Sequence, residues 1–338
     1  MKTTITLIAI MMMFMMGSAT TLTLNNNNPS PGQYVTWIAA HAAANDGDTI
    51  LIHGSTYNYY SLALSKRLTI IGPGHNPIDK QNSQRAFCDN VLFYTGSNRS
   101  KVIGIEAGNM QSSNNDIDSV EIKLCSILDA IYFQTSLCNY WLVDGNVFSS
   151  SGINVNATAN TVGDLVCRNN IFNGFIGNFY GGFIGYNYFN NNIFLANTPY
   201  TFQNCQYFYV NSNIFYRSGL ASLGNLGIAF TKNCSYECVA GNTFPNGVNY
   251  EGVDPLFVTS IGSGAYFSYL TDYHLQSNSP LINAGGDGTD VGVYGGYGDF
   301  NQYGVSHNPY VKTFNITGPT SVNAGTPLQI YLKAKVRN

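Results

Sequence analysis

The chain has 338 residues, a formal net charge of −3 and only 10% charged residues, against about 25% in ordinary globular domains. The weak negative charge argues against a nucleic-acid partner, because such partners select strongly basic surfaces. The hydrophobic share of 44%, with 24 tyrosines and 20 phenylalanines, argues against disorder. A soluble chain with so few charges is typical of extracellular β structure.

The N-terminal residues predict a targeting segment. Lys2 precedes an apolar stretch from Ile5 to Met16, and a run of small residues ends at Ala19. This stretch is shorter than the roughly 20 residues that span a membrane. We expect residues 1–19 to be a cleaved signal peptide, with an uncleaved anchor as the alternative. The mature protein would then be secreted or held at the cell surface, with no membrane contact after cleavage.

The segment 20–48 predicts a cap for the fold that follows. It contains an alanine-rich stretch from Tyr34 to Ala44, which we expect to be a helix that covers the first exposed strand. A strand is expected at Thr49–Ile52. The stretches "RLTIIGPG" (67–74) and "SKVIGIEAG" (100–108) predict further early strands.

A repeated pattern occupies the middle of the chain. The copies are "LVDGNVF", "VCRNNIF", "YFNNNIF", "YVNSNIF" and "CVAGNTF", which end at Phe148, Phe172, Phe194, Phe215 and Phe244. A period near 22 residues indicates a solenoid, and short apolar runs between Asn and Gly indicate strands and turns. We therefore expect an all-β fold, a right-handed single-stranded parallel β-helix of about ten coils over residues 49–296.

Each copy carries an asparagine two places before its phenylalanine. These residues are Asn146, Asn170, Asn192, Asn213 and Asn242. Asparagine tolerates the left-handed backbone that a tight bend needs, and stacked amides can bond to one another. We expect the five to form a structural ladder, with the phenylalanines stacked inside the solenoid.

Seven cysteines leave the redox state open. Cys205 and Cys234 take the same place in neighbouring copies, so a disulfide between them is compatible with the spacing. Cys138 takes the same place further down the stack, and the remaining copies have Val or Ile there, which favours buried free thiols at least as much.

The ends of the repeat region carry a family resemblance. "GDTILIHGSTY" (47–57) and "LTIIGPG" (68–74) resemble the opening of right-handed parallel β-helix proteins of the pectin-lyase-like superfamily. "VDPLFV" (253–258), "DYHLQSNSPLINAG" (272–285) and "DGTDVGVYGG" (287–296) resemble the closing section of secreted bacterial members. The resemblance implies the fold, but the superfamily includes lyases, hydrolases, epimerases, tailspikes and adhesins, so it implies no activity.

An enzyme remains an alternative. Lyases of this superfamily place acids and an Arg or Lys base on one face, and glycoside hydrolysis needs two carboxylates about 5–10 Å apart. Asp144 starts no acidic column, because its expected equivalents in later copies are Arg168, Asn190, Asn211 and Ala240. Candidate bases are Arg85, Arg99, Arg168 and Arg217, and the pattern selects none of them.

Calcium is the one cofactor that the sequence suggests. Asp287 and Asp290, in "GGDGTDVGVYGG", could supply the oxygen ligands that calcium prefers, although a structural turn is favoured. Asp116 and Asp118 alternate in a polar loop that we expect to be solvated, with cation binding as the alternative. No other cofactor is expected.

The tail, residues 297–338, predicts two strands, around Thr313–Thr317 and Leu328–Lys335. We expect it to pack along the solenoid or to cover the last coil. A short anchoring or sorting module is the alternative.

Tyrosines outside the repeat suggest a carbohydrate ligand. The candidates are Tyr57, Tyr59, Tyr60, Tyr294 and Tyr297, whose rings could stack against sugars, although packing of loops explains them equally well. We expect a non-catalytic secreted or cell-surface protein that binds a glycan or serves as a structural rod. The alternatives are a polysaccharide lyase or glycoside hydrolase, and a self-associating adhesin or fibre component.

Overall fold

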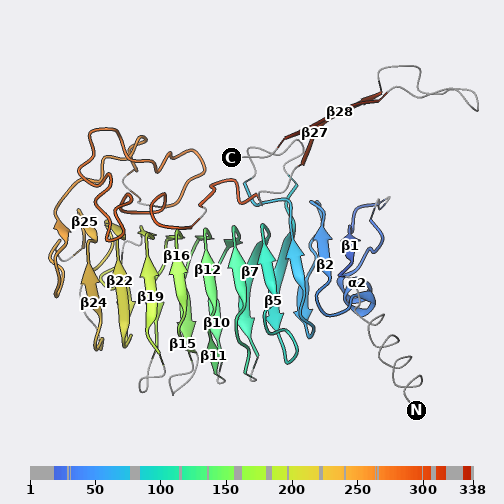
Figure 1. Ribbon diagram of the computed structural model, residues 1–338, viewed down its shortest axis with the longest axis horizontal. Helices are drawn as coiled ribbons and strands as arrows, with labels where there is room; N and C mark the ends of the chain where they lie inside the picture. The colour runs from blue at the N-terminus through green and yellow to red at the C-terminus, as the bar shows by residue number, and fades with distance from the viewer. Residues whose placement is uncertain are drawn as a thin grey trace, which may run out of the picture.

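Parallel strands wind into a β-solenoid of about eight turns in the computed structural model (Figure 1). The structure describes residues 19–335 except 29, 31, 77–83, 114–115, 135–136, 156–161, 180–184, 196–197, 221–223, 240, 263, 265, 299, 306–309 and 317–329. Residues 1–18 of the expected signal peptide therefore lie outside the described part of the chain. The class is the expected parallel β-helix, with fewer turns than the ten or so predicted.

One wall is a ten-stranded parallel sheet that runs along the length of the solenoid. In spatial order its strands are β1 (Thr21–Leu24), β2 (Thr49–Ile52), β4 (Thr69–Ile71), β6 (Lys101–Ile103), β8 (Glu121–Lys123), β12 (Leu142–Asp144), β16 (Val166–Arg168), β19 (Asn187–Asn190), β22 (Phe208–Asn211) and β24 (Ala229–Thr231). In its short middle strands the central residue is buried and the flanking residues face outward. This alternation leaves an outer face of two side-chain columns.

The other walls belong to a fourteen-stranded sheet. Its strands are β3 (Ser61–Leu64), β5 (Phe87–Phe93), β7 (Glu106–Ser112), β9 (Ser126–Ile127), β10 (Ile131–Phe133), β13 (Val147–Phe148), β14 (Ile153–Val155), β17 (Ile171–Phe172), β18 (Ile176–Gly177), β20 (Ile193–Phe194), β21 (Phe202–Gln203), β23 (Ile214–Tyr216), β25 (Cys234–Tyr236) and β26 (Tyr250–Glu251). A small pair, β11 (Cys138–Asn139) and β15 (Val162–Gly163), adds a further contact between coils.

The predicted phenylalanine stack is confirmed for four coils. Phe148, Phe172, Phe194 and Phe215 pair in register, and their ring centroids are 4.4, 5.2 and 4.8 Å apart in turn. All four side chains are fully buried. The last predicted member is wrong: Ser235 pairs with Phe215, and Phe244 packs edge-on against Phe215 from outside the strand ladder.

The asparagine ladder is also confirmed, with one substitution at its end. Nδ2 of Asn146, Asn170 and Asn192 each donates to Oδ1 of the next ladder asparagine at 2.9–3.0 Å. Asn213 then donates to Asn233, not to the predicted Asn242. The Asn242 side chain instead accepts from the Cys238 backbone N–H, within the loop that follows the last long strands.

The left-handed residue is the one before each ladder asparagine, which corrects the prediction. Positive φ angles of 52–69° are found at Gly145, Asn169, Asn191, Ser212 and Lys232. The ladder asparagines themselves do not have positive φ. Their role is to bond to the backbone: Asn192 Nδ2, for example, also donates to the Cys167 carbonyl, and its own N–H is bound by Asn213 Oδ1.

The start of the solenoid is capped as expected. Helix α2 (Trp37–Ala43) begins after Thr36, whose hydroxyl accepts from the Ala39 N–H, and it buries Trp37 and Ala40. The parallel ladder begins earlier than predicted, because β1 already pairs with β2.

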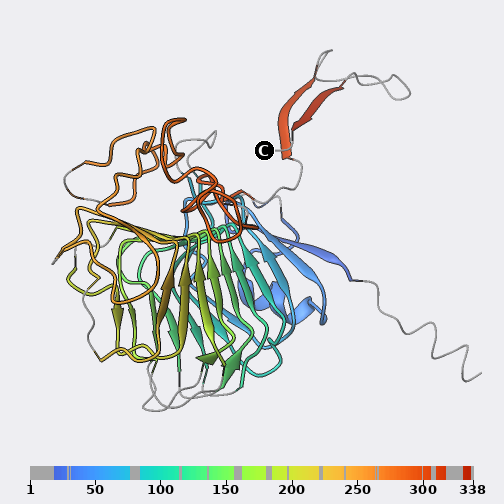
Figure 2. The same cartoon turned by 60° about the vertical axis from the view of Figure 1, so that its left-hand side comes forward.

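Residues 253–305, called the returning segment below, leave the last coil and run back over the solenoid (Figures 1 and 2). They contain no strand among the described residues. Their apolar side chains, including Tyr273, Leu281 and Val291, cover an outward-facing column of Val147, Ile171, Ile193, Ile214 and Cys234 on the fourteen-stranded sheet. This second core explains why the turns are fewer than predicted: the stretch up to residue 296 covers coils that are already made.

The tail forms an antiparallel hairpin of β27 (Tyr310–Ile316) and β28 (Ile330–Lys335), close to the predicted strands. The hairpin is drawn away from the last coil (Figure 1), whereas Phe300 and Tyr303 of the same tail pack along the solenoid, which is the first of the two expected arrangements. Within the described residues, no helix is both long and apolar enough to cross a lipid bilayer.

All seven cysteines are free thiols, and six of them are buried. Cys234 pairs with Ile214 and therefore does not share a column with Cys205, which corrects the expected alignment. Burial raises the pKa of Cys138 and of Cys238 to about 11 and that of Cys125 to about 12. The thiols thus act as small apolar core groups.

Candidate functional site

The outer face of the ten-stranded sheet brings side chains of one kind together over successive coils. Leu142, Val166, Tyr188, Tyr209 and Ala229 form one column. The column two residues further along each strand contains Asp144, Arg168, Asn190, Asn211 and Thr231. Adjacent members of a column are about 4.8 Å apart up the stack. The last position corrects the expected Ala240 to Thr231.

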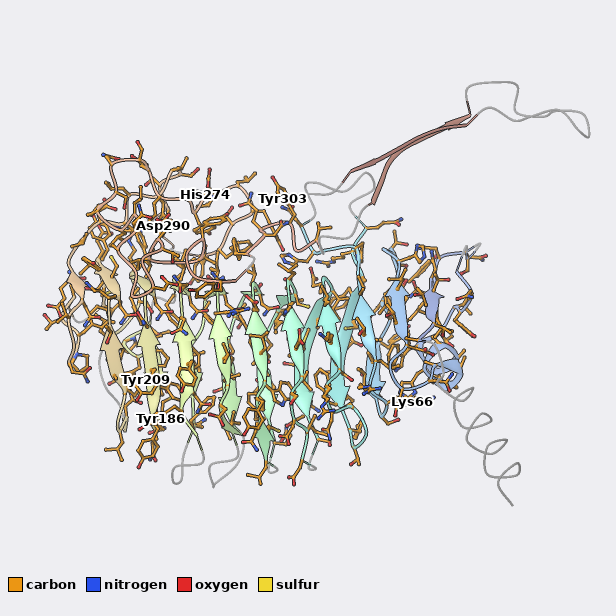
Figure 3. All side chains as sticks on the ribbon, in the orientation of Figure 1. Lys66, Tyr186, Tyr209, His274, Asp290 and Tyr303 are labelled. Carbon is orange, nitrogen blue, oxygen red and sulfur yellow. The ribbon has the colours of Figure 1, made fainter. Side chains whose placement is uncertain are left out.

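Three tyrosines form an aromatic shelf at the C-terminal half of this face. The rings of Tyr188 and Tyr209 are stacked, with centroids 5.5 Å apart and planes inclined by 20°. Tyr186 lies 4.6 Å from Tyr209, and the hydrogen bond with its side chain raises the pKa of Tyr209. Figure 3 shows Tyr186 and Tyr209 on the same part of the wall, well away from Asp290 of the returning segment. Tyr209 is 40% exposed, so a ligand can reach its ring.

A shallow cavity of about 310 Å³ lies over this shelf. Its lining consists of Tyr188, Asn190, Tyr209, Val210, Asn211, Ala229 and Thr231. Every one of these side chains is uncharged. The cavity therefore combines aromatic rings with the amides and hydroxyl of the neighbouring column, which are the groups that bind neutral polar ligands.

The returning segment sets the orientation of one of these amides. Gly286 N–H donates to Ser212 Oγ at 2.9 Å, and the Ser212 hydroxyl donates to Asn211 Oδ1 at 2.8 Å. Among the described residues, Asn211 Nδ2 has no hydrogen-bond acceptor. A Cβ on Gly286 would lie 2.7 Å from Asn211 Nδ2, so only glycine allows this close approach. The amide is thus held in one orientation beside the cavity.

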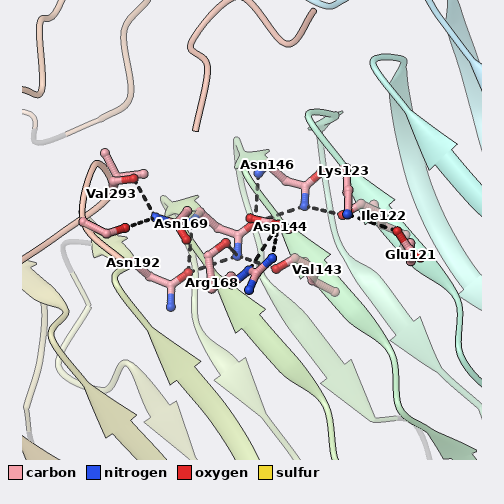
Figure 4. Close-up of polar contacts among 12 residues, drawn as sticks. Glu121, Ile122, Lys123, Val143, Asp144, Asn146, Arg168, Asn169, Asn192 and Val293 are labelled. Carbon is pink, nitrogen blue, oxygen red and sulfur yellow. Dashed lines mark hydrogen bonds and ion pairs between the residues drawn. The ribbon is translucent and has the colours of Figure 1, made fainter. Parts of the chain in front are cut away.

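The N-terminal half of the same face is charged, and its charges are paired. Glu121 contacts Lys101 at 2.8 Å and Lys123 at 3.1 Å. Burial alone would raise the pKa of Glu121, but hydrogen bonds from the two lysines lower it overall. Asp144 accepts two bonds from Arg168, at 2.9 and 3.1 Å (Figure 4). These contacts leave the tyrosine shelf as the uncharged part of the wall.

A second polar cluster lies where the returning segment meets the early coils. The Tyr269 hydroxyl is 2.7 Å from His75 Nδ1, and burial raises the pKa of Tyr269 to about 12. His75 is fully buried, and its backbone N–H donates to the Tyr303 carbonyl. The cluster fastens the returning segment to the loop after β4, and its burial makes it a structural contact.

The candidate bases from the sequence are mostly engaged in ion pairs. Arg85 pairs with buried Glu106, Arg168 with Asp144, and Arg217 with Glu237. Arg99 lies at a turn with φ of 62°. The structure does not gather these four into one site.

The tyrosines predicted from the sequence are scattered. Tyr57 and Tyr60 are 60% and 71% exposed in the second coil, whereas Tyr59 is buried and donates its hydroxyl to the His53 carbonyl. Tyr294 is partly buried and stacks on His274 at 3.6 Å. Tyr297 is 82% exposed on the returning segment. None of these rings lines the cavity described above.

The predicted calcium ligands, Asp287 and Asp290, accept hydrogen bonds from neighbouring residues of the turn. Asp287 accepts from the backbone and hydroxyl of Thr289, and Asp290 accepts from the Asn283 N–H. Asp116 and Asp118 likewise accept from the backbone of the next coil, at Leu137 and Asn139. In the described part of the chain, no group of three His, Cys, Asp or Glu residues is arranged to hold a metal ion.

Sequence analysis missed Tyr188 and Tyr209, although a signal was present. Both are the first letters of repeat copies, "YFNNNIF" and "YVNSNIF", four places before a ladder asparagine. Their alignment in neighbouring copies would have predicted the aromatic shelf.

Comparison with known proteins names no family. No protein-family model matches the sequence, and a search of curated proteins finds no significant match.

Proposed function

We propose that this protein binds an uncharged glycan across the tyrosine shelf of the ten-stranded sheet. The observation that carries the proposal is the cavity in which stacked Tyr188 and Tyr209 stand beside the amides of Asn190 and Asn211. Aromatic rings present flat apolar faces to the C–H groups of sugar rings, and amides bond to their hydroxyls. A single glycan can thus stack on the tyrosine column and form hydrogen bonds with the amide column.

A neutral ligand is favoured over an acidic one. The lining side chains are uncharged, and Arg168, the nearest cation in the amide column, is bound to Asp144. A carboxylated sugar would lose hydration at the shelf, and no side chain of the cavity lining carries a positive charge to compensate. Lys101 and Lys123 share Glu121 several coils away from the shelf.

The location of the protein and its superfamily are part of the same proposal. The N-terminal targeting pattern supports a secreted or cell-surface protein, and the terminal motifs support membership of the pectin-lyase-like superfamily. The partner would then be an extracellular polysaccharide, bound without being cleaved. Calcium, a catalytic role and self-association are not needed for this mode of binding.

Affinity electrophoresis and calorimetry with neutral and acidic polysaccharides test the proposal. We expect saturable binding to a neutral glycan, weakened about 5- to 30-fold by Tyr209→Ala, because one lost aromatic contact removes about 1–2 kcal/mol. An assay for reducing ends and unsaturated products on the same samples should detect no release.

Tyr57→Ala is the matched control, because Tyr57 is also exposed but lies in the second coil. The affinity of the Tyr57→Ala variant for the glycan should equal that of the unmodified protein. A loss on Tyr57→Ala without a loss on Tyr209→Ala would move the site to the tyrosines chosen from sequence. Product release would establish an enzyme instead.

A further inference from the structure

The interior packing changes at the last coil. Three contacts of stacked phenylalanines end at Phe215, because the next residue in that register is Ser235. A phenyl ring is thereby replaced by a hydroxymethyl group. Phe244 covers part of the space, with its ring edge-on to Phe215 at 5.4 Å.

The rings beside this position are spread apart. Phe202, Phe215 and Phe230 lie 6.2–6.5 Å from one another, against 4.4–5.2 Å in the stack below. Phe230 and Phe202 retain 6% and 3% exposure, whereas the phenylalanines of the middle coils retain none. The core is therefore open at this end.

A cavity of about 130 Å³ occupies the opening. Its apolar wall is made by the three rings together with Leu220, Leu226 and Ile228. Two amides also line it, but both are used by the backbone. Asn225 bonds to Cys205 N–H and the Phe202 carbonyl, and Asn246 bonds to Phe230 N–H and the Ile228 carbonyl.

We propose that this cavity is a binding site for a small apolar molecule with a single aromatic ring. The amide groups in the wall are already bonded, so a bound water would find few partners there. An apolar cavity of about 150 Å³ in another protein binds benzene, and the volume of about 130 Å³ found here is similar. The three surrounding rings present both edges and faces, which suits a fourth ring. The site lies at the open end of the solenoid core, with exposed Leu226 at its rim, and is separate from the proposed glycan site on the outer face.

Titration of the full-length chain with benzene and toluene, followed by calorimetry and thermal melting, tests this site. We expect saturable binding of one molecule per chain and a rise in melting temperature. Phenol serves as the polar comparison and should bind more weakly, because its hydroxyl would lose a hydrogen bond to water.

Ile228→Phe fills the cavity and should weaken benzene binding at least about tenfold, because the new ring takes the same space. Leu137→Phe is the control, since Leu137 is exposed and lies many coils away. If Ile228→Phe does not fold, Phe230→Leu replaces it, and the enlarged cavity should shift preference toward propylbenzene. Absence of saturable binding, or benzene binding unchanged in these cavity variants, would overturn the assignment.

Discussion

The ladder asparagines show how much one side chain contributes when its position repeats. Asn213 accepts from both the backbone and the amide of Asn192, and it donates to Asn233 and to two carbonyls. Asn192 and Asn233, its neighbours along the stack, form hydrogen bonds with this same amide. A change at one rung therefore leaves buried polar groups unsatisfied on both sides.

We predict that Asn213→Leu lowers the free energy of unfolding by about 3 kcal/mol or more, since each orphaned buried group costs about 1–3 kcal/mol. Urea denaturation measures the change. Asn190→Leu is the control, because that side chain faces outward and should cost much less. Equal losses of unfolding free energy for the two variants would show that the ladder hydrogen bonds do not stabilise the fold.

Ser212 is predicted to act on binding through Asn211. Ser212→Gly removes the hydroxyl that fixes Asn211 Oδ1, and glycine keeps the left-handed backbone (φ 58°) without strain. We expect glycan affinity per folded molecule to fall several-fold, with Tyr209 stacking intact. Calorimetry on variants matched for folded fraction would measure it, and unchanged affinity would exclude a positioning role.

Asp48 gives the stability a defined dependence on pH. Backbone N–H bonds from Thr20, and then from Asn45, lower the pKa of this carboxyl in the folded protein. Its contribution is thus present above the unfolded value of about 3.9 and is lost as the pH falls through the lower folded value.

We predict that Asp48→Asn destabilises the protein at pH 6 and that the difference from the unmodified protein narrows toward pH 2. Urea denaturation across this range measures it. A difference that is constant with pH would mean that the charge of Asp48 plays no part.

At the scale of elements, the returning segment is part of the core. It lies on the outer column of the fourteen-stranded sheet and also contacts the turn: Asn169 Nδ2 donates to the carbonyls of Val293 and Gly295. Figure 4 shows Asn169 between this segment and the Asp144–Arg168 pair.

Leu281→Ala should therefore cost about 2–5 kcal/mol, as expected for a fully buried leucine. Leu270→Ala, in the same segment but 79% exposed, should cost less than about 0.5 kcal/mol. Chemical denaturation of both variants compares them. A small loss for Leu281→Ala would indicate that the segment only rests on a solenoid that is stable alone.

At the scale of the whole molecule, the repeat made most of the fold predictable. The asparagine and phenylalanine of the repeat, Asn170 and Phe172 in one copy, return at nearly constant spacing along the chain. A parallel stack must place such equivalent residues over one another. The last coil could not be aligned in this way, because "NCSY" lacks the phenylalanine while "GNTF" in the following loop imitates the motif. The returning segment has no period, and its partners on the solenoid are distant in sequence: Ser212 and Gly286 are 74 residues apart, and Asn169 and Gly295 are 126 apart. The tyrosine shelf was not predicted, because Tyr188 and Tyr209 stand on the outer face, next to the interior positions that define the repeat.

The most direct test is a crystal structure of the protein with a neutral oligosaccharide that it binds in solution. The account predicts sugar rings against Tyr188 and Tyr209, with hydroxyls bonded to Asn190 and Asn211. Electron density for the sugar at Tyr57 or Tyr297, with the shelf empty, would contradict it.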